Sequence, residues 1–173
     1  MISSQRLVLK PLSHNKLIKF VKNDGSLEAE LKLNPSKKTF TPELSEALTE
    51  TILPNVLDAG KDHLLCTLWA IILKTESRII GDICFVGKPD ENGEIEIGYR
   101  TDENFRGNGY MTEAIACLLE WLQLHKTIKS VFAQTSIDNP ASSKVLEKNN
   151  FQNIGKDDEV INWKWKIRAQ ELA

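Results

Sequence analysis

The residues best suited to bind a charged group lie at positions 106–112, directly before a segment with the apolar spacing of a helix. They are Arg106, Gly107, Asn108, Gly109, Tyr110, Met111 and Thr112. The first turn of a helix leaves about four backbone N–H groups without partners, and glycine lets a ligand approach them closely. Together with the helix dipole, this arrangement favours a phosphate or pyrophosphate. The alternative is that the two glycines only shape a turn.

Two familiar phosphate-binding patterns do not fit these residues. Thr112 stands where the dinucleotide pattern GxGxxG requires its third glycine, and the P-loop pattern GxxxxGK[ST] is absent. The pattern R-x-x-G-x-(G/A) fits from Arg106 through Gly109, with Met111 in place of the usual small residue. This segment resembles the acyl-CoA pyrophosphate loop of the GNAT N-acetyltransferase superfamily. Helical spacing places the Met111 side chain in the core, which leaves the backbone donors free.

Further motifs resemble the ribosomal-protein N-terminal acetyltransferase branch of that superfamily, the RimJ/RimL-like type. They are Glu96-Ile97-Gly98-Tyr99, Thr112-Glu113-Ala114 and Asn139-Pro140-Ala141-Ser142, followed by Leu146, Lys148 and Phe151. The resemblance covers residues 64–156 and, more loosely, the N-terminal strand and two helices. Asn150 replaces the glycine usual before the final Phe, and asparagine is the next best residue for a left-handed helix cap.

The resemblance implies that acetyl-CoA is the cosubstrate, and no metal is expected. Two strands, near residues 94–101 and 130–135, would splay apart, and the pantetheine arm would pair with the first of them like an added strand. The residues expected to hold acetyl-CoA are Tyr99, Arg100, Thr101, Arg106, Gly107, Asn108, Gly109, Tyr110, Met111, Thr112 and Asn139. Asn139 also precedes Pro140, which is an ordinary helix start, so it has both a capping and a cofactor role open to it.

Glu96 is the residue that we expect to act as general base, with Glu94 as a weaker candidate. A primary amine is mostly protonated at neutral pH and must lose a proton before it attacks a thioester. Glu94, Glu96 and Arg100 share one face of a strand, which indicates either solvent or a functional cleft. The resulting oxyanion needs backbone N–H donors. Gly98 interrupts this strand and suggests a bulge or a close backbone approach; a bulge would free one such N–H.

Ser142 is the candidate for assisting the leaving thiolate. In many GNAT enzymes a tyrosine on the helix that follows Asn139 protonates this thiolate, but Leu146 occupies the corresponding position here. The RimJ/RimL-like resemblance offers Ser142 instead. We expect its hydroxyl to donate a hydrogen bond or to orient a water, because serine is a poor acid. The alternative is that Ser142 is simply a small polar residue in the first turn of a helix.

Periodicity predicts a mixed sheet with helices packed on it. Strands are expected at residues 6–9, 64–73, 79–86, 94–101, 130–135, 151–155 and 161–167, and helices within 13–59 and at 109–125 and 140–148. The order strand, helix, strand from Glu94 predicts a right-handed βαβ crossover. Together with this pattern, the resemblance implies an α/β (α+β) fold, the acyl-CoA N-acyltransferase (GNAT) fold. It has a mixed, mostly antiparallel sheet of six to seven strands flanked by helices, in one domain over residues 1–173.

Composition narrows the class of protein. The 173 residues are 41% hydrophobic and 27% charged, with a net charge of −2, so neither nucleic acid nor membrane is an expected partner. Cys66, Cys84 and Cys117 lie in apolar runs without metal-binding spacing, which predicts buried free thiols in a reducing compartment. The lack of a leader-like or membrane-length apolar segment favours the cytoplasm. A homodimer is compatible with the sequence but not readable from it.

The acceptor is expected to be a primary amine, and the resemblance favours a protein N-terminal α-amine. A small-molecule acetyltransferase, acting on a polyamine, an amino acid or an antibiotic, fits the same motifs. A catalytically idle acyl-CoA-binding regulatory module would keep residues 106–111 but would need no base. A nucleotide-binding regulator would share the phosphate cradle, but no adenine or ribose signature accompanies it. Substrate choice should depend on the loops at 34–40, at 58–64 and before Ile161.

Overall fold

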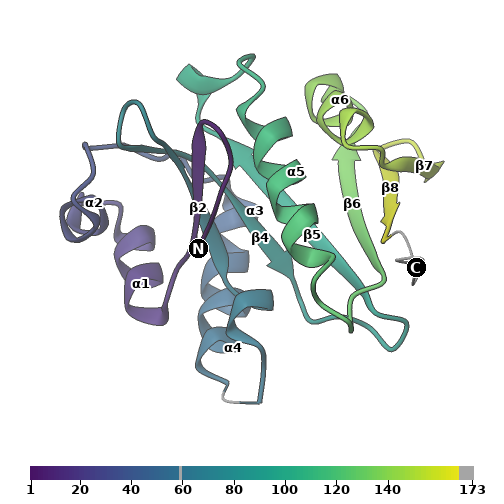
Figure 1. The fold of residues 1–173 in the computed structure, drawn as a ribbon, viewed down its shortest axis with the longest axis horizontal. Helices are drawn as coiled ribbons and strands as arrows, with labels where there is room; N and C mark the ends of the chain where they lie inside the picture. The colour runs from purple at the N-terminus through teal and green to yellow at the C-terminus, as the bar shows by residue number, and fades with distance from the viewer. Residues whose placement is uncertain (59, 168–173) are drawn as a thin grey trace.

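One mixed sheet runs through the computed structural model, which describes residues 1–58 and 60–167 (Figure 1). Residue 59, at the end of the expected helix-rich stretch, and residues 168–173, at the end of the expected domain, lie outside the described residues. The strands are β1 (Ile2–Ser3), β2 (Leu7–Pro11), β3 (Leu68–Leu73), β4 (Arg78–Val86), β5 (Glu94–Thr101), β6 (Ser130–Ser136), β7 (Gln152–Lys156) and β8 (Val160–Lys166). Their order in the sheet is β1-β2-β3-β4-β5-β6-β8-β7.

The described part of the chain thus has eight strands where we expected six to seven. The additional strand is β1, which pairs with β2 through Ile2↔Leu9 and Ser3↔Val8. Two residues are too few for an alternation pattern to reveal. β3 begins at Leu68, later than expected, because His63–Leu65 form a 3₁₀ turn, in which the Asp62 side chain accepts the Leu64 N–H.

Six α-helices accompany the sheet within the described residues: α1 (His14–Lys22), α2 (Ser26–Leu31), α3 (Pro42–Glu46), α4 (Leu53–Leu57), α5 (Tyr110–Leu122) and α6 (Pro140–Lys148). A π-helical segment, Ala47–Ile52, joins α3 to α4. The start signal of α3 is confirmed, since the Thr41 side chain accepts the Leu44 N–H. The predicted crossover is also confirmed, because β5 and β6 are parallel and α5 connects them, while the other neighbouring strands are antiparallel.

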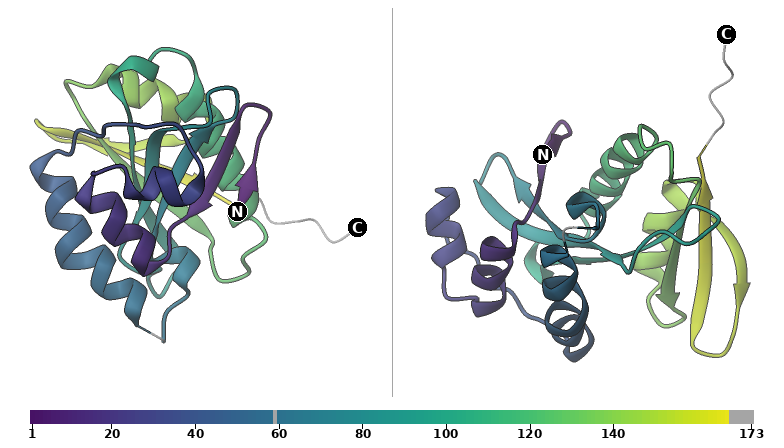
Figure 2. Two further views of the ribbon diagram at one scale, coloured as in Figure 1. Left: turned by 90° about the vertical axis from the view of Figure 1, so that its left-hand side faces the viewer. Right: turned by 90° about the horizontal axis from the view of Figure 1, so that it is seen from below.

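The sheet separates two hydrophobic cores. Figure 2 shows α5 on one side of the sheet and α1 and α4 on the other. The first core joins α5 and α6 to the sheet through residues such as Leu118, Leu146 and Trp163, and the second joins α1 and the π-helical segment to β3 and β4. Met111 belongs to the first core, as helical spacing predicted. Trp163 is buried there too, so it is a packing residue.

The register between β4 and β5 corrects one expectation. Pairing runs without a shift from Gly81↔Thr101 through Cys84↔Gly98 to Val86↔Glu96, so the bulge predicted at Gly98 is wrong. The sheet does have two irregularities, but they lie between Ile71 and Ile72 of β3 and between Asn153 and Gly155 of β7. A Cβ added at Gly98 would meet the Cys84 sulfur at an ordinary 3.5 Å, so close approach of the backbone does not require this glycine either.

Candidate active site

An opening in the sheet separates the C-terminal halves of β5 and β6. The two strands pair only from Glu94↔Ser130 to Glu96↔Phe132, although β5 continues to Thr101 and β6 to Ser136. Figure 1 shows them diverging from this paired end. The predicted splayed strand pair is therefore present, and one edge of β5 beyond Glu96 is free of strand partners in the described structure.

The hydrogen-bond phase of β5 decides which backbone groups face this opening. In an antiparallel ladder, successive residues turn their N–H and C=O groups alternately toward and away from the partner strand. The Asp102 N–H donates to the Ile80 carbonyl, just beyond the Gly81↔Thr101 pair. Even-numbered residues of β5 therefore bond β4. Beyond the last pair with β6, Glu96↔Phe132, whose ladder uses the Ile97 N–H, Tyr99 and Thr101 direct their N–H and C=O groups into the opening. The N–H of Gly98 does not face it.

The loop before α5 provides a second set of backbone donors. Gly107 and Gly109 have φ of +76° and +75°, a conformation that L side chains rarely adopt, so a substitution at either position would strain the backbone. Among the described residues, none of the backbone N–H groups from position 107 to 112 donates a hydrogen bond. These unpartnered donors stand at the positive end of the α5 dipole, which fits a pyrophosphate.

A groove of about 450 Å³ connects this loop with the opening between β5 and β6. It is lined by Tyr99, Arg100, Thr101, Phe105, Arg106, Gly107, Gly109, Tyr110, Met111, Thr112, Asn139, Ala141, Ser142, Lys144, Val145 and Lys148. The structure thus brings together most of the predicted cofactor residues. Asn108 does not line the groove, because its side-chain amide is bonded to the carbonyls of Phe105 and Arg106 within the loop.

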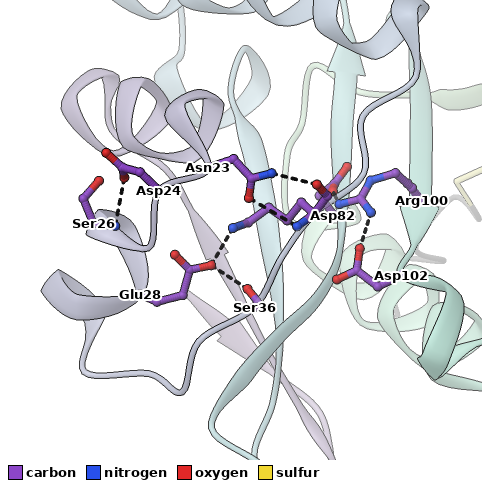
Figure 3. A network of polar contacts seen from close by, with 9 residues as sticks. Asn23, Asp24, Ser26, Glu28, Ser36, Asp82, Arg100 and Asp102 are labelled. Carbon is purple, nitrogen blue, oxygen red and sulfur yellow. Dashed lines mark hydrogen bonds and ion pairs between the residues drawn. The ribbon is translucent and has the colours of Figure 1, made fainter.

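Arg100 lines the groove but is already engaged on both its backbone and its side chain. Its backbone faces β4, and its guanidinium donates to Asp82 at 2.5 Å and to Asp102 (Figure 3). Burial raises the pKa of Asp82 to about 6, and the Arg100 charge acts against that rise. Of the predicted cofactor-binding residues on β5, Tyr99 and Thr101 therefore remain to pair with an extended ligand. The Thr101 carbonyl also accepts a hydrogen bond from Arg106 Nε at 3.2 Å.

The 34–40 loop is anchored beside this ion-pair cluster. Lys38 Nζ lies 2.5 Å from Glu28 Oε1 with both side chains buried, and the Ser36 hydroxyl donates to the same oxygen (Figure 3). The Asn23 amide brackets the Lys38 backbone, donating to its carbonyl at 2.7 Å and accepting its N–H at 3.2 Å. A loop that we expected to influence substrate choice is thus held by a buried ion pair.

The two candidate bases differ in their surroundings. Glu94 Oε2 accepts from Ser130 Oγ at 2.8 Å and lies 2.6 Å from Lys164 Nζ. Glu96 is partly buried, and its carboxylate makes no hydrogen bond or ion pair with a described residue. Burial, and secondarily the charge of Glu94, raise the pKa of Glu96. A carboxylate that is desolvated and unpaired is suited to accept a proton.

The N-terminus of α6 meets β5 across the opening. Asn139 caps α6 with its Oδ1, which accepts the Ser142 N–H at 3.1 Å, so the predicted cap is confirmed. The Ser142 hydroxyl donates to the Tyr99 hydroxyl oxygen at 2.7 Å, and the Tyr99 hydroxyl can donate to the Ser142 carbonyl at 3.1 Å. Leu146 is fully buried in the core, so it leaves the acid position of other GNAT enzymes without a polar group.

Sequence reasoning missed several groove residues. Ala141, Lys144, Val145 and Lys148 recur at helical spacing and form the α6 wall of the groove, a signal that periodicity could have supplied. The contact between Arg6 and Glu113, which lie outside the groove lining, was missed for another reason. They are 107 residues apart in the sequence, yet the Arg6 Nε lies 2.6 Å from Glu113 Oε2 beside the loop.

Residues 6–152 match the family model described as the acetyltransferase (GNAT) domain, and the chain therefore belongs to the GNAT acetyltransferase family. An uncharacterized N-acetyltransferase of Bacillus subtilis, YjdG, is 39% identical over 95 residues, which are 55% of this chain and 56% of that protein. The chain spans about half the length of the curated relatives that it matches.

Solved structures share the fold at lower identity. RimL, a ribosomal L7/L12 alpha-N-protein acetyltransferase in complex with coenzyme A, matches with a TM-score of 0.66 and 21% identity over 95% of this chain and 96% of that one. AAC(6')-Ib, in complex with ribostamycin and coenzyme A, matches with a TM-score of 0.63 and 15% identity over 94% of each chain. At these identities the matches show the GNAT fold.

Other features of the described residues concern the remaining expectations. Cys66, Cys84 and Cys117 are buried free thiols, as predicted, and burial raises the pKa of each. No group of three or more His, Cys, Asp or Glu side chains in residues 1–58 and 60–167 could hold a metal ion. In the same residues, no helix has the length and apolarity that crossing a membrane requires.

Proposed function

We propose that this protein transfers the acetyl group of acetyl-CoA to a primary amine, with a protein N-terminal α-amine as the favoured acceptor. The observation that carries the proposal is the groove that joins the unpartnered N–H groups of residues 107–112 to the free edge of β5. The family supports the acetyl-transfer chemistry. The resemblance to the RimJ/RimL-like branch supports the acceptor.

Acetyl-CoA, when bound, would supply an acetyl thioester. The backbone from Gly107 to Thr112 would hold its pyrophosphate, with Arg106 adding positive charge beside the loop. The Tyr99 C=O and the Thr101 N–H would pair with the amides of the pantetheine arm. The Tyr99 N–H also faces the opening, so it takes over the oxyanion-donor role that we first expected from Gly98.

Glu96 would take the proton from the amine. Its side chain projects from the face of β5 opposite to Ile97 and Tyr99, because side chains alternate along a strand. An acceptor approaching from this face would therefore meet the base on the far side of the opening from the cofactor groove. Glu94 is a poorer candidate, because its carboxylate is already engaged by Lys164 and Ser130.

Ser142 would support departure of the thiolate by hydrogen bonding. Burial raises the pKa of Tyr99 to about 12, against the opposing effect of the Ser142 hydrogen bond. Neither hydroxyl is therefore a strong acid at neutral pH. If the Ser142 hydroxyl turns its proton toward the sulfur, the Tyr99 hydroxyl can donate to the Ser142 hydroxyl oxygen instead of the Ser142 backbone carbonyl. Both hydroxyl protons then stay hydrogen-bonded.

A small-molecule amine is the alternative acceptor, and a regulatory module that binds acyl-CoA without turnover is the alternative class. The proposal also includes a cytoplasmic location and a single domain over residues 1–173. The decisive experiment offers purified protein acetyl-CoA and matched acceptors: peptides with free N-termini, the same peptides with blocked N-termini, a polyamine, an amino acid and an aminoglycoside. Thiol release and product mass are the readouts.

Acetylation of free but not blocked peptides is the expected result. Turnover only with a small amine would replace the favoured acceptor by the alternative one. CoA binding without turnover on any acceptor would favour the regulatory module. Equal thermal shifts with ADP and with CoA would mean that the groove along β5 holds no pantetheine arm, and the proposal would then be wrong.

A further inference from the structure

Arg6, directly before β2, contacts the loop before α5 and the first turn of α5 in three ways. Its Nη1 donates to the Asn108 carbonyl at 3.1 Å, and its Nε donates to Glu113 Oε2 at 2.6 Å. Its guanidinium carbon also lies 4.6 Å from the centre of the Tyr110 ring, within the range of a cation–π contact. One planar side chain from the N-terminal hairpin thus contacts Asn108 in the loop and both Tyr110 and Glu113 in the first turn of α5.

Glu113 is held from the same hairpin by further donors. Its Oε1 accepts from Ser4 Oγ at 2.7 Å and from the Arg6 backbone N–H at 2.8 Å. Burial by itself raises the pKa of Glu113, but the hydrogen bonds from Ser4 and Arg6 outweigh it and leave the pKa lowered. The carboxylate is therefore ionised at neutral pH, so the ion pair between Arg6 and Glu113 joins the hairpin to α5 at that pH.

Two physical consequences follow for the loop. A carboxylate in the first turn of a helix suits the helix dipole but would repel a phosphate bound at the same end, and the Arg6 charge offsets this repulsion. The loop also contains two glycines with positive φ, so ordering it on binding would cost conformational entropy if nothing held it beforehand. Contacts to Asn108, Tyr110 and Glu113 order it in advance.

We propose that Arg6 is a positioning residue for the phosphate-binding loop, which it holds in the conformation that presents the N–H groups of residues 107–112 to a pyrophosphate. Arg6 does not line the groove; its Nη2 lies 3.7 Å from the place where a Cβ of Gly109 would be. It acts through the loop and through Glu113. The identity of the ligand rests on the proposed function.

The test compares Arg6→Gln and Arg6→Lys with Arg78→Gln. Arg78 is a matched control, because it is similarly exposed (39% against 41% for Arg6) and pairs with Glu76 away from the groove. Calorimetry gives Kd for CoA and for ADP, steady-state kinetics separates KM for acetyl-CoA from kcat, and thermal unfolding gives Tm. ADP carries the pyrophosphate without the pantetheine arm, so it reports on the loop alone.

Arg6→Gln is expected to raise Kd for both CoA and ADP by roughly tenfold, equivalent to about 1.4 kcal/mol. KM for acetyl-CoA should rise in parallel while kcat at saturation stays near wild type. Arg6→Lys should not restore binding, because an ammonium cannot contact the carbonyl, the carboxylate and the ring together. Arg78→Gln should bind like wild type. Glu113→Gln provides a second variant if Arg6→Gln folds poorly, and it should weaken both ligands as well.

Wild-type Kd values in the Arg6 and Glu113 variants would overturn the inference and leave the proposed function standing. A lowered Tm would also overturn it if Kd and KM, measured at a temperature well below that Tm, are unchanged. The residue would then be merely structural. Recovery of binding in Arg6→Lys would reduce its role to charge alone and contradict positioning. A wild-type protein that binds neither CoA nor ADP would overturn the proposed function and this inference together.

Discussion

The hydroxyl of Ser142 donates a hydrogen bond to the hydroxyl oxygen of Tyr99 at 2.7 Å, across the opening between α6 and β5. This contact joins the residue expected to assist the thiolate to the strand expected to hold the pantetheine arm. The Ser142 backbone N–H is independently fixed by the Asn139 cap at 3.1 Å. The hydroxyl is therefore free to serve chemistry without being needed to start the helix.

Ser142→Ala is expected to fold normally and to slow the chemical step. The Asn139 cap and Pro140 still begin α6, so Tm should change little. Turnover should fall where chemistry is rate-limiting, and CoA affinity should hold. Tyr99→Phe should lower turnover too, and the double variant should lose less than the two single losses combined, because the hydroxyls act as one unit. Unchanged turnover in Ser142→Ala would assign this residue a structural role only.

Glu96→Gln is expected to lower turnover at neutral pH by about 10²–10⁴-fold, the usual contribution of a positioned base. The deficit should shrink as pH approaches the pKa of the amine, because the free amine then needs no base. Glu94→Gln is the control and should do much less, since Glu94 is engaged by Lys164 and Ser130. A loss of equal size at every pH would instead assign Glu96 to amine binding.

The raised pKa of Glu96 predicts opposite effects on activity and stability. The folded protein favours the protonated acid, so the ionised form destabilises the fold as pH rises through the raised pKa. Glu96→Gln removes that charge and should keep or increase Tm at pH 7. In wild-type protein, the midpoint of the acid limb in the pH profile of kcat/KM should lie above 4.5, the ordinary pKa of glutamate. A lower Tm for Glu96→Gln at pH 7 would contradict this assignment.

Gly109→Asp is expected to abolish most of the stabilisation by CoA. At a ligand concentration 100 times Kd, binding adds about 2.7 kcal/mol to the free energy of unfolding. The substitution strains a φ of +75° and places a negative charge at the phosphate loop. Gly87→Asp is a matched control, because Gly87 has a φ of +81° but lies outside the groove. The Gly87 variant should lose a similar amount of unfolding free energy through backbone strain, and CoA should still stabilise it as it does the wild type.

Lys38→Met is expected to destabilise the fold by about 3–5 kcal/mol, because it leaves the buried Glu28 carboxylate without its partner. Urea unfolding measures this change. The loss should be smaller near pH 5, since the unpaired acid can then take up a proton. Lys38→Met combined with Glu28→Leu should recover much of the stability. If the double variant is as unstable as the single one, the loop is held by packing and not by the ion pair.

Local sequence signals predicted the elements that carry the site. The bounds of β5 and α6 follow from alternation and from an Asn-Pro helix start, and Met111 was assigned to the core from helical spacing alone. The ordered motifs also led to the GNAT family, which the match over residues 6–152 establishes. Such features are encoded within a few neighbouring residues, so a linear reading can recover them.

Only the tertiary structure decided how groups from distant segments meet. The regular register with β4 turns the Gly98 N–H away from the opening and presents the backbone groups of Tyr99 and Thr101 instead. Spacing could not rank Glu94 against Glu96, because the ranking depends on Lys164, which β8 brings across the sheet. The ion pair between Arg6 and Glu113 likewise forms because the first hairpin packs against α5. These contacts join residues far apart in sequence, and no local pattern encodes them.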